Sequence, residues 1–231
     1  MYNDLLTSNV TLSSKLKKIF VWMALGLLIS ASVAYLVLQS GLWYTIALSF
    51  GGYGSLLLLF AQLGVVILLS KGFRDYTATT CRNLFVLYSV LTGFTLSVLP
   101  IIYDISTIFM AFGLSSLLFV NMAIIGYTTK KDLTKFGPLL MAGLITLIAT
   151  SILNMLFNLS AIEMVVNYGA VLLFLALTAY DMQKIKKLYY QFETTNDYQM
   201  MDKLTIIGAL ELYLDFINLF LYILRILGRK K

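Results

Sequence analysis

One stretch near the C-terminus carries polar and charged side chains at helical spacing within an otherwise apolar run. The residues are Glu211, Asp215, Asn218, Tyr222 and Arg225, separated by four, three, four and three positions. On a helix that spacing places all five on one stripe. If the run crosses a membrane, Asp215 is the first candidate for chemistry, because a carboxylate in hydrocarbon is costly and marks a functional site by default. The structural alternative is an ion pair, for instance between Asp215 and Arg225.

Asp181, at the end of the preceding apolar run, is the second candidate, although an aspartate at a membrane boundary can simply reach water. Two carboxylates that meet in a low dielectric cannot both ionise cheaply, so they share a proton and titrate as a unit. Once deprotonated they attract a cation. Calcium prefers six to eight oxygen ligands, so two carboxylates and water would hold it loosely, which suits permeation. The chain has no histidine, so carboxylates must provide any response to pH near neutrality.

These side chains must be positioned by membrane helices. Of the 231 residues, 60% are hydrophobic and 12% are charged, whereas soluble domains carry about 25% charged residues. The mean hydropathy is +0.87. A helix needs about 20 apolar residues to cross the hydrocarbon core. The sequence therefore predicts an all-α integral membrane protein, a single polytopic domain over 1–231. Its seven expected helices are Ile19–Gln39, Trp43–Leu69, Asn83–Ile102, Ile105–Gly126, Pro138–Asn158, Ile162–Asp181 and Leu204–Leu227.

Basic residues alternate between the two sides of the predicted bundle. They precede the first run and lie between the second and third, the fourth and fifth, and the sixth and seventh runs, while the short intervening connections carry none. The positive-inside rule then predicts a cytoplasmic N-terminus. The length of Leu204–Leu227 favours a full span, which puts the C-terminus outside; a re-entrant seventh helix would return it to the cytoplasm. The net charge of +6 suits anionic lipid rather than nucleic acid, which we do not expect as a partner.

Four motifs in order resemble those of the Bax inhibitor-1 family, also called the transmembrane Bax inhibitor motif family. Leu212–Phe220 reads LYLDFINLF and resembles the signature of the last helix. Gly93–Ser97 (GFTLS), Thr128–Thr134 (TTKKDLT) and Thr178–Gln183 (TAYDMQ) are similar to a motif of the third helix, a basic loop after the fourth, and the tyrosine-aspartate motif of the sixth. The likeness covers nearly the whole chain, whose small size and short loops resemble the bacterial members.

The resemblance implies six helices around a central, hydrophobic seventh, and a pH-sensitive calcium leak gated by two aspartates. At the matching positions the pair is Asp181 and Asp215, which would also be weak calcium ligands. In the family an arginine near the cytoplasmic end of the second helix latches the pair, and Arg74 is the first choice here and Lys71 the second. Many relatives carry a glutamate where this chain has Gln62, which puts a calcium ligand there in doubt.

Three functions stay open from the sequence. The favoured one is the pH-sensitive calcium leak, with calcium as the permeating ion and no cofactor or enzyme activity. The second is a non-catalytic regulator that binds another membrane protein, such as a protease or stress factor. An intramembrane aspartyl protease is the remote third, since Tyr180-Asp181 matches half of such a signature. However, the second aspartate follows Tyr213-Leu214 rather than the expected glycine motif.

Overall fold

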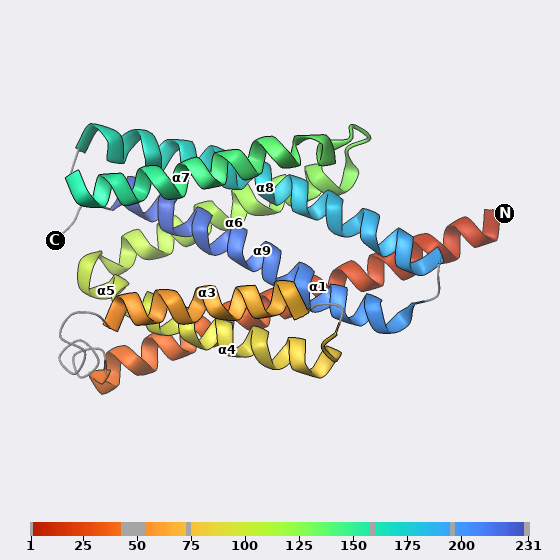
Figure 1. The fold of residues 1–231 in the computed structure, drawn as a ribbon, viewed down its shortest axis with the longest axis horizontal. Helices are drawn as coiled ribbons and strands as arrows, with labels where there is room; N and C mark the ends of the chain where they lie inside the picture. The colour runs from red at the N-terminus through yellow and green to blue at the C-terminus, as the bar shows by residue number, and fades with distance from the viewer. Residues whose placement is uncertain (1, 43–53, 73–74, 158–159, 195–196, 229–231) are drawn as a thin grey trace. The chain divides into compact units, whose positions relative to one another are not determined.

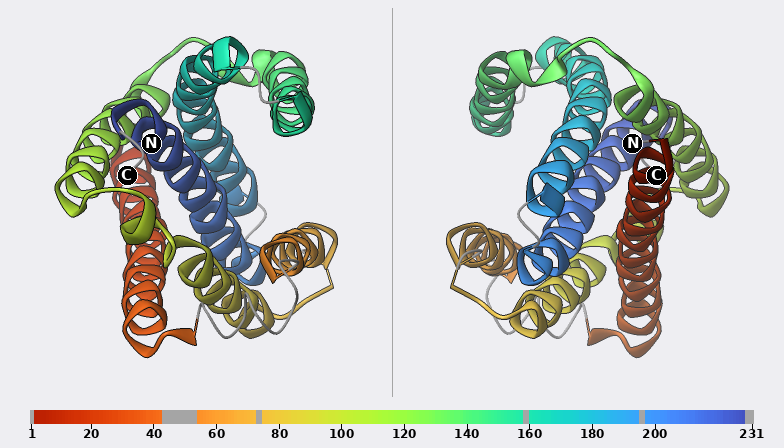
Figure 2. Two further views of the ribbon diagram at one scale, coloured as in Figure 1. Left: turned by 90° about the vertical axis from the view of Figure 1, so that its left-hand side faces the viewer. Right: turned by 90° about the vertical axis from the view of Figure 1, so that its right-hand side faces the viewer.

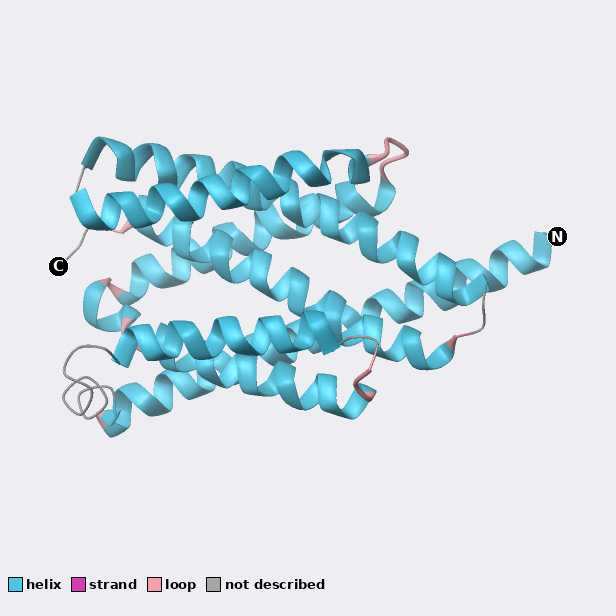
Figure 3. Ribbon diagram, in the orientation of Figure 1, coloured by secondary structure: helices cyan, strands magenta, loops and turns pink. Residues whose placement is uncertain are grey.

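The computed structural model describes residues 2–42, 54–72, 75–157, 160–194 and 197–228 (Figure 1). Within these ranges the chain forms helices and no strand (Figure 3), which confirms the all-α class. The helices are α1 Tyr2–Ser40, α3 Gly54–Gly72, α4 Ala78–Leu96, α5 Leu99–Ile102, α6 Ile105–Thr128, the 3-10 turn η1 Leu133–Phe136, α7 Gly137–Phe157, α8 Ser160–Thr194 and α9 Tyr198–Leu227.

Six described helices are long and apolar enough to cross a membrane, and α3 carries a shorter apolar stretch, Leu57–Ser70. The expected second helix, Trp43–Leu69, begins in a segment outside the described residues. The C-terminal helix α9 has 67% of its apolar window buried, against at most 33% for any other of the six. This agrees with the expectation that the last helix is the most enclosed one.

Several helix ends differ from the apolar runs. Helix α8 continues through Asp181 to Thr194 and α9 begins at Tyr198, so Asp181 lies in a helix interior rather than at a helix end. Beyond Asp181 the buried Met182, Ile185 and Tyr189 recur at helical spacing among polar residues, and no glycine or proline interrupts them. Burial of this face stabilises the helix beyond Asp181, so the candidate span continues to Phe192.

The chain divides into two compact units. The first comprises Met1–Ile101 and Leu188–Tyr213, and the second comprises Ile102–Lys187 and Leu214–Lys231. Helices α8 and α9 each contribute a part to both units. Asp181 and Asp215 therefore belong to the same unit, the second.

In the first unit α1 packs closely against α4 (Figure 2). A Cβ atom added at Gly93, the glycine of the GFTLS motif, would lie 2.7 Å from the carbonyl oxygen of Ser30. The Ser30 hydroxyl bonds the carbonyl oxygens of Gly26 and Ser89 at 2.9 and 2.8 Å and lies 2.6 Å from the Tyr213 hydroxyl. Since carbonyl oxygens only accept, the Ser30 proton goes to one of them and Tyr213 donates to Ser30. Gly93 thus lets α4 approach α1, and the Ser30 hydroxyl joins α1 to α4 and α9.

In the second unit the basic loop between α6 and α7 is held on α8, directly after Asp181. Gln183 donates from Nε2 to the Lys131 carbonyl (2.8 Å) and accepts from the Leu133 amide at Oε1 (2.7 Å). One turn further, Lys187 forms an ion pair with Asp132 at 2.5 Å. These bonds satisfy the loop backbone and fix the α8 segment that carries Asp181.

Helix α6 also packs against this segment of α8, and the contact is at Gly126. A Cβ atom added at Gly126 would lie 2.2 Å from the carbonyl oxygen of Ala179 and 2.8 Å from its Cα atom. Only glycine permits such a backbone contact, a common device of membrane helix pairs. By contrast, a Cβ atom at Gly113, also on α6, would meet nothing within 4 Å.

We expect Gly126→Ala to destabilise the protein by about 1–3 kcal/mol, because the added methyl group meets backbone that cannot step aside. The matched variant is Gly113→Ala, which should be neutral or stabilising because alanine favours the helix and has room. Thermal unfolding in detergent measures both. An equal effect of the two substitutions would contradict the contact between α6 and α8.

The loop makes a second, pH-dependent prediction. The Lys187 ammonium and the Thr134 hydroxyl lower the pKa of the exposed Asp132 from 3.8 to about 2. Because this pKa is depressed in the folded state, the pair contributes above the ordinary value of 3.8 and is lost as the pH falls toward about 2. In Lys187→Gln the pKa of Asp132 should return toward 3.8, as read from the carboxyl carbon shift by NMR. Lys130→Gln, a loop variant outside the pair, should leave it near 2.

Candidate functional site

The two aspartates singled out by the sequence lie on consecutive membrane-length helices. Asp181 is on α8 and Asp215 on α9, and their residues are only 9% and 5% exposed. The apolar spans around them are Ile162–Phe192 and Gln199–Leu227. Buried carboxylates in such helices require partners or water within the protein. Both residues meet the first requirement of the expected pair, and direct contact between their carboxylates stays a prediction.

Asp181 has a cationic neighbour that the sequence reasoning missed. The Lys184 Nζ atom lies 3.7 Å from Asp181 Oδ1, one turn along α8. This distance exceeds the 2.7–2.9 Å typical of a charge-assisted hydrogen bond, so the pair is loose. On the other side, the buried Thr178 hydroxyl donates to the Phe174 carbonyl at 2.7 Å. The available signal was the spacing of three positions between Asp181 and Lys184.

Aromatic contacts hold the Asp215 segment of α9 against α6. The Phe216 ring meets the Phe112 ring edge to face at 5.4 Å and the Phe119 ring at 5.6 Å. Phe220 meets Phe112 from one turn further along, at 6.2 Å. Because Phe216 directly follows Asp215 and Phe220 lies one turn further on, these contacts limit how the Asp215 segment of α9 can rotate.

The rest of the polar stripe on α9 is divided among different partners. The Asn218 amide donates to the Leu214 carbonyl of its own helix at 2.8 Å. The Tyr222 ring stacks on the Phe174 ring of α8, with 6.0 Å between centroids and 23° between planes. That stack joins α8 to α9 within the second unit. The Asn218 side chain therefore hydrogen-bonds within α9, and Tyr222 packs α9 against α8.

The two charged ends of the stripe lie at different distances from Asp215 along α9, Glu211 one turn before it and Arg225 ten residues after it. Glu211 is half-buried in the part of α9 that belongs to the first unit. The Arg225 guanidinium lies 4.9 Å from the Tyr222 ring centroid. Ten residues of helix separate Arg225 from Asp215, a rise of about 15 Å. An ion pair between Arg225 and Asp215, the structural alternative from the sequence, is therefore excluded.

The expected latch cannot be assigned to one residue. Arg74 lies outside the described residues, and for Lys71 only the backbone is described, in the last turn of α3. The latch therefore stays a prediction. Gln62, where the family resemblance implies a glutamate, donates from Nε2 to the Thr95 and Thr92 hydroxyls of α4 at 3.2 and 3.4 Å. An amide can donate these bonds and a carboxylate cannot, so Gln62 fits a packing role.

Comparison with known proteins covers almost the full chain. The family model described as "Inhibitor of apoptosis-promoting Bax1" matches residues 12–231. Inner membrane protein YbhL of Escherichia coli K12 is 40% identical over 95% of this chain and 93% of its own length. A protein of Borreliella burgdorferi named only "Uncharacterized protein" is 38% identical over 94% and 92% of the two chains. An uncharacterized membrane protein of Streptococcus pyogenes serotype M1 is 35% identical over 96% and 95%.

The family match spans all four motifs and both aspartates, and the helices have the lengths and apolarity of membrane spans. With relatives named as membrane proteins at 35–40% identity over nearly their whole lengths, the chain is a membrane protein that belongs to the Bax inhibitor-1 family.

Proposed function

We propose that this chain is a pH-sensitive calcium leak channel gated by Asp181 and Asp215. The observation that carries the proposal is the burial of these two carboxylates in one compact unit, on consecutive membrane-length helices. The Tyr222 and Phe174 rings stack between α8 and α9, and family membership supports the same assignment.

The gate works by proton sharing. With one shared proton the pair carries a single negative charge and stays together. Loss of that proton leaves two negative charges that repel each other and attract a divalent cation. Because the two sites interact, flux follows the titration of the pair rather than of either residue.

Loose calcium binding suits this role. Among the described residues no group of three or more histidine, cysteine, aspartate or glutamate side chains could hold a metal ion. Two carboxylates and water release calcium readily, as permeation requires. The proposed activity needs no cofactor and no catalytic step.

The proposal includes a cytoplasmic N-terminus. The basic loop between α6 and α7, with Lys130, Lys131 and Lys135, would face the cytoplasm, and the uncharged connection after α1 would face outside. Asp181 then lies nearer the cytoplasmic surface, next to that loop, and Arg225 lies near the outer surface.

We expect Asp215→Asn to abolish the pH dependence of calcium flux into proteoliposomes, measured with a trapped indicator at acidic, neutral and alkaline pH. An asparagine cannot take part in proton sharing. Asp181→Asn should act in the same direction. The matched control is Asp202→Asn, which removes an exposed carboxylate from the same helix and should leave the pH profile unchanged. Flux that is absent in the wild type at every pH, or unaltered in Asp215→Asn, would contradict the channel assignment.

The orientation has its own test. Cys81 is the single cysteine and is buried, so a Cys81→Ala background offers no natural thiol. In that background Ser40→Cys should react with a membrane-impermeant maleimide in intact cells. Lys130→Cys should react only after the membrane is permeabilised. The opposite pattern would place the N-terminus outside.

A further inference from the structure

Several polar side chains in the membrane-length helices of the second unit are satisfied within their own helix. The hydroxyls of Ser116 on α6 and of Thr146 and Thr150 on α7 each donate to the carbonyl oxygen four residues earlier. A hydroxyl has a single proton to donate. These residues can therefore face hydrocarbon without a donor left unpaired.

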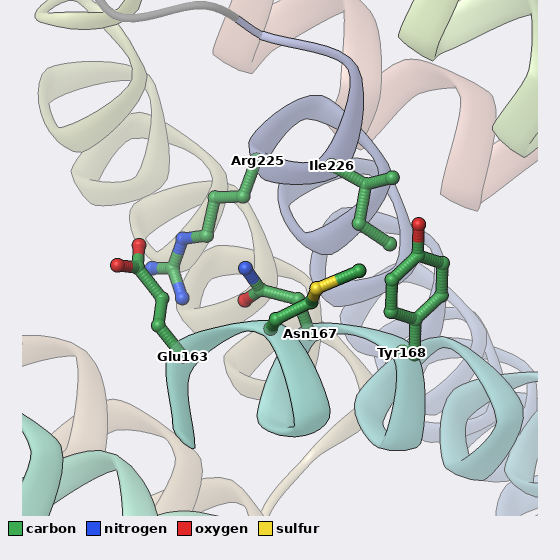
Figure 4. Close-up of a pocket in the computed structure, with 6 residues that line it drawn as sticks. Glu163, Asn167, Tyr168, Arg225 and Ile226 are labelled. Carbon is green, nitrogen blue, oxygen red and sulfur yellow. The ribbon is translucent and has the colours of Figure 1, made fainter. Parts of the chain in front are cut away.

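A cavity between the first turns of α8 and the last turn of α9 holds two charges of opposite sign. Its volume is about 280 Å³, and it is lined by Glu163, Met164, Asn167, Tyr168, Arg225 and Ile226. The side chains of Glu163 and Arg225 point toward one another (Figure 4), and the Arg225 guanidinium also lies over the Tyr222 ring. The two charges offset each other, so this cavity is balanced without a charged ligand.

Asn121 on α6 differs from these groups. It lies in the apolar span Ile105–Thr128, seven residues from the nearer end, which is about 10 Å of helix, and its side chain is exposed. Its Nδ2 atom donates one hydrogen bond, to the Leu117 carbonyl of the same helix at 2.8 Å. A carboxamide has a second N–H and a carbonyl oxygen, and neither bonds another group in the described part of the chain. Because hydrocarbon cannot bond them, the amide requires a partner from another molecule.

Asn121 belongs to a row of exposed residues that runs along α6. The spacing in the row is four, three, four, three and four positions, and its members are Met110, Leu114, Leu117, Asn121, Ile124 and Thr128. The buried residues of α6, among them Phe119 and Gly126, lie on another side and contact α9 and α8. The spacing of the row is that of a left-handed helix pair, in which a single asparagine fixes the register and the oligomeric state. Left-handed pairs are also the common geometry of membrane helices.

A second copy of this chain fits the row in direction and in chemistry. Copies of one chain insert with the same orientation, so a two-fold axis between them follows the membrane normal and their α6 helices run parallel. Such an interface is isologous, and Asn121 of one copy meets Asn121 of the other at the same depth. An amide both donates and accepts, so the two side chains can exchange two hydrogen bonds. The row contains no charged residue, so the copies do not repel each other along it.

We propose that this chain forms a parallel, two-fold dimer in the membrane through the α6 row, held by reciprocal hydrogen bonds between the two Asn121 side chains. Lipid chains are as apolar as the leucine and isoleucine of the row, so apolar burial adds little to the association and the amide pair decides it. The dimer does not depend on the proposed calcium activity.

The first test measures association of the full chain in phosphatidylcholine vesicles, by energy transfer between donor-labelled and acceptor-labelled copies as the protein is diluted with lipid. Asn121→Leu should need about tenfold more protein per lipid to reach half of the wild-type transfer, because a pair of interhelical hydrogen bonds is lost. Asn121→Gln keeps the amide and should keep the association. The matched control is Thr146→Leu, which removes an exposed polar group bonded to its own helix and should behave as the wild type does.

Two results of this measurement would overturn the proposal. One is wild-type transfer no greater than that of randomly distributed copies. The other is equal transfer in the wild type and in Asn121→Leu, which would place any association on another face.

The same variant separates association from folding. The Asn121 side chain is exposed and its one bond stays within α6, so Asn121→Leu should keep or raise the Tm of the monomer at high detergent, since leucine favours the helix. A lowered Tm together with unchanged transfer would show that Asn121 serves the fold of a single chain, and would overturn the proposal.

Cross-linking in native membranes locates the interface. In the Cys81→Ala background, Leu117→Cys, 62% exposed and on the row, should be joined to a second copy by a short thiol cross-linker. The matched control is Phe109→Cys, which is 71% exposed but lies about 120° around the helix from Asn121, and should stay unlinked. Equal linking at both positions, or a Leu117→Cys product with a different protein in place of the second copy, would overturn the assignment.

Discussion

Hydrocarbon cannot hydrogen-bond a backbone amide or solvate a charge, and this constraint governs the molecule at every level. Each membrane-crossing segment must be a helix because only a helix satisfies its backbone internally. Large apolar side chains, such as those of Phe109 and Leu172, are then free to be exposed, and polar ones such as Thr178 and Asp215 are buried. A soluble domain rarely exposes apolar side chains on this scale. In this setting a buried carboxylate stands out as a functional feature.

The same constraint explains how the helices associate. Lipid chains are as apolar as leucine, so burial alone does not drive one membrane helix against another. Gly93 and Gly126 instead allow backbones to approach, and the Ser30 and Tyr213 hydroxyls bond across helices. Many of the remaining hydroxyls, such as that of Ser115, bond carbonyl groups of their own helix. A motif glycine is therefore a packing element that holds the polar residues in register.

Three features lie along helix α8. Its first turns line a cavity with Asn167, its middle carries Asp181, and its amphipathic extension binds the basic loop through Gln183 and Lys187. The loop motif therefore has a physical role, which is to hold the α8 segment that carries Asp181.

The sequence by itself determined the properties that belong to one segment. Apolar length marked the membrane spans, and the motif around Asp215 identified the family, because both can be read locally. The placement of Asp181 in a helix interior required the structure, since the extension of α8 is stabilised by burial of Ile185 and Tyr189 rather than by apolarity. The tertiary structure also shows that the polar residues of α9 have different surroundings: Tyr222 stacks on Phe174 of α8, and Arg225 lines a cavity. Which residues of different helices face one another is a long-range property, and the spacing within a single helix does not encode it.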